Sequence, residues 1–171
     1  MRYLVLLAAF LALAGCATQE MSDWERRNID ARPAEDNLAL PAYPAPGKLI
    51  PFSVSDSGGF RFFVDGATLT VGKDRVVRYV LVARSADGAQ NVSYEGMRCA
   101  AGEYRIYAIG RSDGSWVESR TGWRPVRGAP ARQVALYREY FCPQAEPLRD
   151  AAEGVRALQE GGHPFAKGFG R

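Results

Sequence analysis

The side chains that could carry hydrolytic chemistry are few in this sequence. Glu95 and Glu103 flank Cys99, and two carboxylates on successive strands could hydrolyse a glycan if they met in one cleft. We interpret both as outward-facing charges and keep a small glycan or peptidoglycan hydrolase as the alternative function. His163 is the single histidine, which excludes a two-histidine metal site and leaves it a surface or capping role. No metal, cofactor or catalytic residue is expected.

A binding face is the other chemistry that the residue pattern suggests. Alternation along residues 103–110 predicts that Tyr104, Ile106 and Ala108 point inward. The outward side of residues 91–111 should then carry a basic and aromatic group, made of Arg98, Arg105, Tyr107 and Arg111. Such a face would suit an anionic ligand.

The charge distribution bears on the same question. Residues 47–145 carry a net charge of +5 and residues 16–46 a net charge of −3. A basic body could bind lipopolysaccharide, peptidoglycan carboxylates or nucleic acid. No basic stripe alternates with aromatic residues, however, so we favour the interpretation that these charges solvate the outer faces. We expect an envelope protein or an anionic glycan as partner, and no nucleic acid.

The N-terminus has the pattern of an export signal. Arg2 precedes a twelve-residue apolar run that is too short to span a bilayer, and residues 1–15 are predicted to be a signal peptide. Residues 13–16, Leu-Ala-Gly-Cys, resemble the lipobox of bacterial lipoproteins. The resemblance implies cleavage before Cys16 and attachment of fatty acyl chains, such as palmitate, to that residue. Ala17 then favours a periplasm-facing lipoprotein of the outer membrane, anchored through its lipid.

The two other cysteines are predicted to form a disulfide. With Cys16 lipidated, Cys99 and Cys142 remain in an oxidising compartment, where an isolated pair is usually bridged. A redox-active dithiol would favour Cys-x-x-Cys spacing, which is absent.

The chain divides into four parts by composition. Residues 16–46 are acidic, rich in proline and without hydrophobic period, which predicts an extended tether in which Trp24 is the exception. Residues 47–145 are expected to form a β-rich domain, and residues 146–171 a C-terminal helix and tail.

Period-two alternation predicts the sheet of that domain. Three Asp-Gly pairs, at residues 65–66, 87–88 and 113–114, are each expected to turn a hairpin. Residues 76–84 are apolar on nearly both faces and predict a central strand. Pro125 places residues 123–126 at a sheet edge.

Two helices are expected after the sheet. Pro130 suits the start of a helix over residues 131–141, with Val134, Tyr137 and Phe141 on one face. A second helix is predicted from Pro147 to Glu160. The fold class is α+β: a curved antiparallel β-meander of about six strands, one helix packed on it and a C-terminal helix.

Several strings of the chain resemble the cryptic neisserial protein-like family of uncharacterised proteobacterial envelope proteins. The similar segments are residues 37–52, 61–65, 76–79, 91–99, 123–125, 140–143 and 161–164. The resemblance spans about residues 23–165, with one departure at residues 73–75, where Asp-Gly would be expected. It implies an envelope location and the extent of the domain, and it implies no catalytic or ligand-binding residue. The lipobox, the acidic proline-rich tether and the lack of catalytic machinery in the sequence lead us to expect a non-enzymatic binding or envelope-maintenance module.

Overall fold

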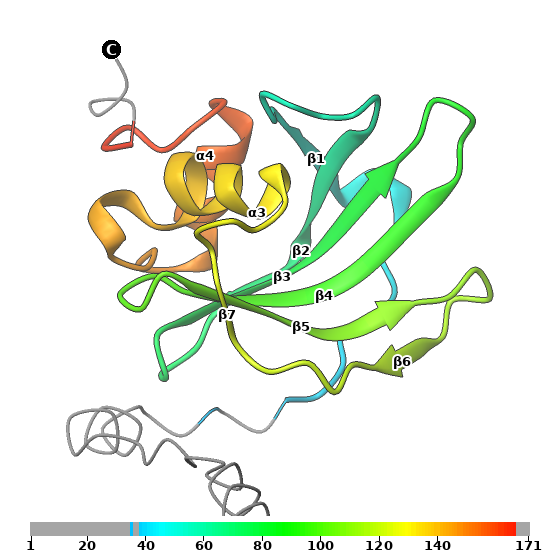
Figure 1. The fold of residues 1–171 in the computed structure, drawn as a ribbon, viewed down its shortest axis with the longest axis horizontal. Coiled ribbons are helices and arrows are strands. Elements are labelled where there is room, and N and C mark those ends of the chain that lie inside the picture. The colour runs from blue at the N-terminus through cyan, green and yellow to red at the C-terminus, as the bar shows by residue number, and fades with distance from the viewer. Residues whose placement is uncertain (1–34, 36–37, 167–171) are drawn as a thin grey trace, which may run out of the picture. The chain divides into compact units, whose positions relative to one another are not determined.

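The computed structural model describes Glu35 and residues 38–166, which contain a seven-stranded antiparallel sheet with helices on one face (Figure 1). The predicted signal peptide, Cys16 and Trp24 lie outside the described residues. The strands are β1 (Leu49–Phe52), β2 (Arg61–Val71), β3 (Val76–Arg84), β4 (Gln90–Arg98), β5 (Glu103–Gly110), β6 (Trp116–Glu118) and β7 (Arg124–Pro125).

The helical elements are short and lie mostly after the sheet in the chain. They are η1 (Pro46–Lys48), α3 (Ala131–Ala135), the π-helix η2 (Leu136–Phe141), η3 (Pro143–Ala145) and α4 (Ala151–Gln159). No helix in this part of the chain is both long and apolar enough to cross a membrane.

The strands follow one another in chain order from β1 to β6, and β7 pairs with β5. This arrangement confirms the predicted α+β meander. Turns form as predicted at Asp87–Gly88 and Asp113–Gly114, where both glycines have positive φ. Every residue of β3 except Arg84 is buried, as expected for a central strand.

The inner face of the sheet, which the helices cover, holds the larger core. Side chains such as Tyr79 and Leu81 of β3 pack there against Leu136 and Phe141 of the helical segment. α4 packs on β1 and β2. Gly154 permits this contact, because a Cβ there would lie 2.5 Å from a methyl carbon of Leu69.

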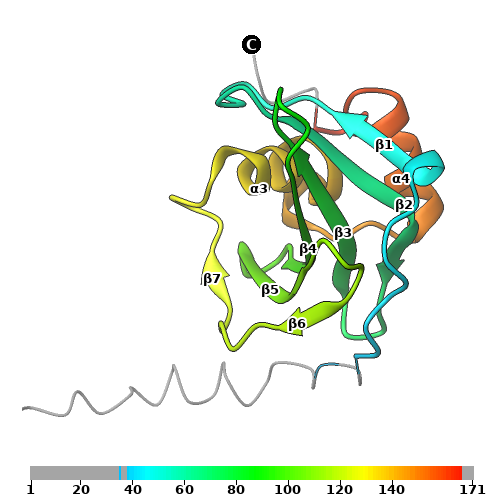
Figure 2. The ribbon, with the colours of Figure 1, turned by 90° about the vertical axis from the view of Figure 1, so that its right-hand side faces the viewer.

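The outer face of the sheet is covered by the chain that precedes η1 (Figure 2). The Tyr43 hydroxyl donates to the Arg111 carbonyl (2.8 Å), and the Trp116 indole N–H donates to the Pro41 carbonyl (2.9 Å). Leu38 also packs against this second cluster. The described end of the predicted tether is therefore part of the folded body rather than free chain.

Asp65–Gly66 does not form the predicted hairpin turn, because β2 continues through it and shifts register instead. The Asp65 side chain accepts a hydrogen bond from the Ala67 N–H (3.0 Å), and the Thr68 hydroxyl donates to the Asp65 carbonyl (2.9 Å). These bonds satisfy polar groups where the ladder is irregular. The chain reverses at residues 72–75, where Arg75 adopts φ 61°, a conformation that favours glycine.

Both predicted helices differ in detail from the structure. The first is an α-helix only to Ala135 and continues as a π-helix, so Tyr140 is buried while Val134 and Tyr137 are only partly buried. The wider turn ends with the Cys142 N–H donating to the Tyr137 carbonyl (3.1 Å). The second helix begins later than predicted, at Ala151, where the Asp150 side chain caps the Glu153 N–H.

The predicted disulfide between Cys99 and Cys142 is present, with a Cα–Cα distance of 5.2 Å. It joins the chain just after β4 to the end of η2, and both cysteines are buried. Tyr137 reinforces the connection, because its hydroxyl donates to the Cys99 carbonyl (2.9 Å). The sheet and the helical layer are therefore covalently linked.

Candidate functional site

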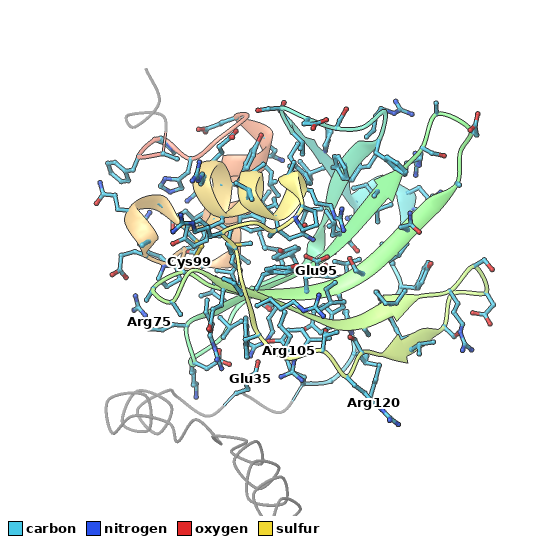
Figure 3. All side chains as sticks on the ribbon, in the orientation of Figure 1. Glu35, Arg75, Glu95, Cys99, Arg105 and Arg120 are labelled. Atoms are coloured by element: carbon cyan, nitrogen blue, oxygen red, sulfur yellow. A yellow bond between two sulfur atoms is a disulfide. The ribbon has the colours of Figure 1, made fainter. Side chains whose placement is uncertain are left out.

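The end of β4, the first half of β5 and the residue before β7 contribute to an arginine–aromatic group on the outer face, where Figure 3 shows Arg105 near Glu35. The Arg98 guanidinium lies 4.1 Å from the ring centroid of Trp123, and that of Arg105 lies 5.1 Å from the ring centroid of Tyr107. The two rings meet edge to face at 6.2 Å. We call Arg98, Arg105, Tyr107 and Trp123 the outer-face cluster. Its two guanidinium groups make cation–π contacts with the faces of the two aromatic rings.

The carboxylate of Glu35 is bound by this cluster. Arg105 Nη1 donates to Glu35 Oε2 (2.7 Å), and the Tyr107 hydroxyl donates to Oε1 (2.6 Å). Arg105 Nε donates in addition to the Thr121 carbonyl (3.1 Å), which fixes the orientation of the guanidinium. Burial, together with the hydrogen bond to Glu35, raises the pKa of Tyr107, so its hydroxyl remains a donor. The arrangement is that of a carboxylate site with charge-assisted hydrogen bonds.

The backbone of β4 makes room for the Tyr107 ring at Gly96. A Cβ at Gly96 would lie 2.6 Å from Tyr107 Cε2, so only glycine allows the ring to lie over the strand. Across the ladder from Gly96, Arg78 is 3% exposed, pairs with Asp74 and lies 5.9 Å from the Tyr107 ring centroid. This buried ion pair adds a third guanidinium beneath the cluster.

The structure brings together three of the four residues of the predicted binding face and leaves Arg111 outside. Arg111 lies beyond the end of β5, roughly 20 Å along the sheet from Arg105 at about 3.3 Å per residue. The prediction assumed unbroken alternation, but the ladder is irregular opposite Tyr94. Ala108, predicted to point inward, therefore packs in the outer cluster with Tyr107.

Sequence reasoning missed Glu35, Trp123 and Arg78 as members of this site. Glu35 was assigned to the tether and Trp123 to a sheet edge. Arg78 offered the one usable signal, because it is a charged residue inside the otherwise apolar run 76–83. Its cross-strand neighbour Gly96 could not be identified without the register.

Glu95 and Glu103 do not meet in one cleft, so the geometry that the alternative hydrolase hypothesis requires is absent. Glu95 lies on the inner face beneath α3, fully buried, and its register partner on β5 is Ile106. Glu103 lies three residues before Ile106 on β5. It shares the outer face with Arg105, two residues further on, and is thus on the face opposite to Glu95. A mechanism that needs both carboxylates cannot act here.

Glu95 is also not the outward-facing charge that alternation predicted. Its carboxylate accepts hydrogen bonds from the Ser93 hydroxyl (2.6 Å), the Tyr79 hydroxyl (3.2 Å) and the Gln133 side-chain amide (3.2 Å to each oxygen). Burial raises the pKa of Glu95, although the hydrogen bonds from Ser93 and Gln133 oppose the shift.

His163 is buried and connects the C-terminal segment to the helices. Its backbone N–H donates to the Glu139 carbonyl (2.6 Å), and its Nδ1 accepts from the Phe165 N–H (3.3 Å). The proton therefore lies on Nε2, which donates to Glu153 (3.2 Å). Partial burial of the Glu153 carboxylate raises its pKa, but hydrogen bonds from the Arg149 N–H and from His163 outweigh this effect, so the pKa of Glu153 is lowered. These contacts make His163 a structural residue.

The model of the CNP1-like family matches residues 29–159 of the chain. The matched range contains the whole outer-face cluster, Glu35 and both cysteines of the disulfide. No curated protein sequence and no solved structure matches the chain.

Proposed function

The chain belongs to the CNP1-like family, and on that premise we propose that it is a bacterial cell-envelope lipoprotein that binds carboxylates of an anionic envelope glycan without catalysing a reaction. The observation that carries the binding proposal is the carboxylate of Glu35, held by Arg105 and Tyr107. In a complex, a carboxylate of the glycan takes the place of Glu35. A disulfide in the folded body and the lipobox at Cys16 support the envelope location.

The geometry supports binding more than it supports chemistry. Arg105 and Tyr107 each donate one hydrogen bond, to different oxygens of the same carboxylate. Beside them, Arg98 covers one face of the Trp123 ring, and the partly exposed remainder of this indole is where we place a sugar ring. Neither a nucleophile nor a second carboxylate directed at the same point is found among the residues of the cluster.

Binding to peptidoglycan sacculi tests the glycan proposal. We would use the full-length chain with Cys16→Ser, so that the protein is secreted without lipid, and compare native sacculi with sacculi whose carboxylates have been amidated. Native sacculi should bind and amidated sacculi should not. Equal binding to both would contradict the proposal.

Two variants and one control test whether the glycan binds at the outer-face cluster. Arg105→Gln removes a charge-assisted hydrogen bond, for which about tenfold or greater loss of affinity is expected. Glu35→Gln should strengthen binding, because the internal carboxylate no longer competes. Arg138→Gln, an exposed arginine on η2, is the matched control and should bind like the parent. If Arg105→Gln behaved like this control, the site would lie elsewhere.

The lipoprotein proposal has its own test. Mass spectrometry of the N-terminal peptide from the envelope fraction should find acyl chains on Cys16, and Cys16→Ser should leave the membrane fraction. Ala17→Asp should move the protein from the outer to the inner membrane. An unmodified Cys16 at the mature terminus would disprove the anchor without affecting the glycan proposal.

A further inference from the structure

A pocket of about 460 Å³ opens on the inner face of the sheet, next to the first residues of α3. This size falls within the range of sites that enclose small molecules. Its apolar side chains come from β2, β3, β5 and the loop before β2; they are Phe60, Phe62, Leu81, Ala83, Ile106 and Ile109. Between β3 and β5, strand β4 contributes the polar side chains of Asn91 and Ser93. The pocket thus has one apolar part on β2 and β3 and another on β5.

Both apolar parts are partly open to solvent. Ile109 is 45% exposed although it lines the pocket, and its cross-strand partner Val117 is 38% exposed. Phe60 is partly exposed and stacks on Phe62, with ring centroids 6.3 Å apart. A hydrocarbon group that covered these side chains would remove apolar surface from water, which favours binding.

Arg132, the second residue of α3, places a positive charge at the rim of the pocket. The residue is partly exposed, and within the described part of the chain its guanidinium donates no hydrogen bond and forms no ion pair. A guanidinium presents several N–H donors in a plane that matches the two oxygens of a carboxylate. An anionic head group can therefore reach Arg132 and bind there.

The two carboxylates that also line the pocket offer a ligand much less. Glu95 is fully buried on the helix-covered side of the sheet (Figure 3), and its carboxylate already accepts hydrogen bonds from three neutral side chains. Arg132 interacts with it only electrostatically. Asp56 is exposed on the loop after β1, where water screens its charge. The ligand charge that the pocket complements best is therefore negative.

We propose that this pocket binds a fatty acid of medium chain length as its carboxylate. The carboxylate pairs with Arg132, and the alkyl chain covers the apolar side chains of β5 and of β2 and β3. From β5 to β2 the sheet spans roughly 14 Å, at about 4.8 Å between neighbouring strands. A flexible alkyl chain can contact both apolar parts over this span, whereas a single small side chain cannot. The site lies on the face opposite to the outer-face cluster and is independent of the glycan proposal.

Compounds that share one alkyl chain but differ in head group test the assignment. We would titrate the full-length Cys16→Ser protein, which carries no lipid of its own, and follow the methyl NMR signals of Ile106 and Ile109. From octanoate to decanoate to dodecanoate, each added methylene should strengthen binding about twofold to fourfold. Decanol and decyltrimethylammonium should each bind about tenfold more weakly than decanoate, because neither can pair with Arg132.

The same titration can overturn the proposal. Equal binding of the three decyl compounds would exclude the carboxylate as the recognised group, and tighter binding of the ammonium compound would assign the site to Asp56 instead. Absence of methyl shifts at Ile106 and Ile109 below the micelle concentration of each compound would exclude the pocket itself.

Variants separate the charge from the apolar surface. Arg132→Gln should weaken decanoate binding about tenfold and leave decanol binding unchanged, whereas Ile109→Ser should weaken both compounds alike. Arg138→Gln, an exposed arginine of η2 outside the pocket, is the matched control. Arg105→Gln should leave decanoate binding unchanged, so failure of this site and failure of the glycan site are distinguishable. If Arg132→Gln bound decanoate as tightly as Arg138→Gln, the assignment of the head group would be wrong.

Discussion

Replacing Gly96 by alanine would test how the outer-face cluster is built. The added Cβ would lie 2.6 Å from Tyr107 Cε2 and 2.7 Å from the Tyr107 hydroxyl, where ordinary contacts begin at 3.4 Å. The ring must therefore shift by roughly 1 Å. Because the hydroxyl donates to Glu35 over 2.6 Å, a shift of this size takes the hydrogen bond beyond its normal length.

The cost to stability should remain moderate. Overpacking of this kind costs about 1–3 kcal/mol, and the lower chain entropy of alanine in the unfolded state returns about 0.4–1 kcal/mol. The variant should thus fold with a free energy of unfolding lower by roughly 1–2 kcal/mol. The effect on carboxylate binding should be easier to detect. Loss of a hydrogen bond to a charged group costs about 1.5–3 kcal/mol, which weakens affinity about tenfold to a hundredfold.

The assay should use the Glu35→Gln background, in which no internal carboxylate competes with the glycan. Urea unfolding followed by tryptophan fluorescence gives the stability, and sacculus binding gives the affinity. Gly122→Ala is the matched control: it lies next to Trp123, and a Cβ there would meet no atom within 4 Å. If Gly96→Ala bound sacculi as well as Gly122→Ala did, the Tyr107 hydroxyl would have no part in carboxylate binding.

Three further predictions concern the fold. Cys99→Ala with Cys142→Ala removes a disulfide that joins residues 43 positions apart. The loss of this cross-link should lower the free energy of unfolding by about 4 kcal/mol and Tm by roughly 10–15 °C in calorimetry; an unchanged Tm would refute this. Gly154→Ala should destabilise by about 1–2 kcal/mol in urea despite the better helix propensity of alanine, since its Cβ would meet two leucine side chains at 2.5 and 2.7 Å. Because burial raises the pKa of Glu95 above 4.5, its contribution makes stability fall as pH rises from about 4.5 through the folded pKa. Glu95→Gln should remove that fall, and an identical pH profile of unfolding free energy would contradict the assignment.

Local pattern was enough to predict much of the sheet, but not where its irregularities lie. Alternation and the apolar run 76–84 identified the central strands because each strand buries at least one face. Two of three Asp-Gly pairs turn the chain, while Asp65–Gly66 does not. The dipeptide is the same in each case. Whether the dipeptide turns the chain depends on whether the backbone hydrogen-bonding groups of a continuing strand find partners. At Asp65–Gly66 the Thr68 hydroxyl supplies them, because it donates to the Asp65 carbonyl and accepts from the Val80 N–H.

The candidate sites were less accessible to sequence reasoning, since tertiary contacts define them. Alternation found Arg105 and Tyr107 correctly on one face, but one irregularity in the β4–β5 ladder removed Arg111 from it. Glu35 reaches Arg105 from 70 residues away, and no local period reports such a contact. The burial of Glu95 likewise depends on Gln133 in α3, which packs on β4 only after the helix has docked.

The outer-face segment from Leu38 to Pro46 also determines how the protein would respond to mechanical load. Tension from the N-terminal side loads the hydrogen bonds of Glu35 to Arg105 and Tyr107 first, then this segment, and β1 last. Apart from apolar packing, single side-chain hydrogen bonds at Tyr43 and Trp116 hold it, whereas β1 is paired along its length with β2. We therefore expect Glu35 and then the segment to detach before β1. At about 3.3–3.6 Å per residue, release of the segment adds roughly 30 Å of reach. Because Glu35 must leave Arg105 before the segment is released, we expect a stretched chain to present its carboxylate site empty while the sheet stays intact.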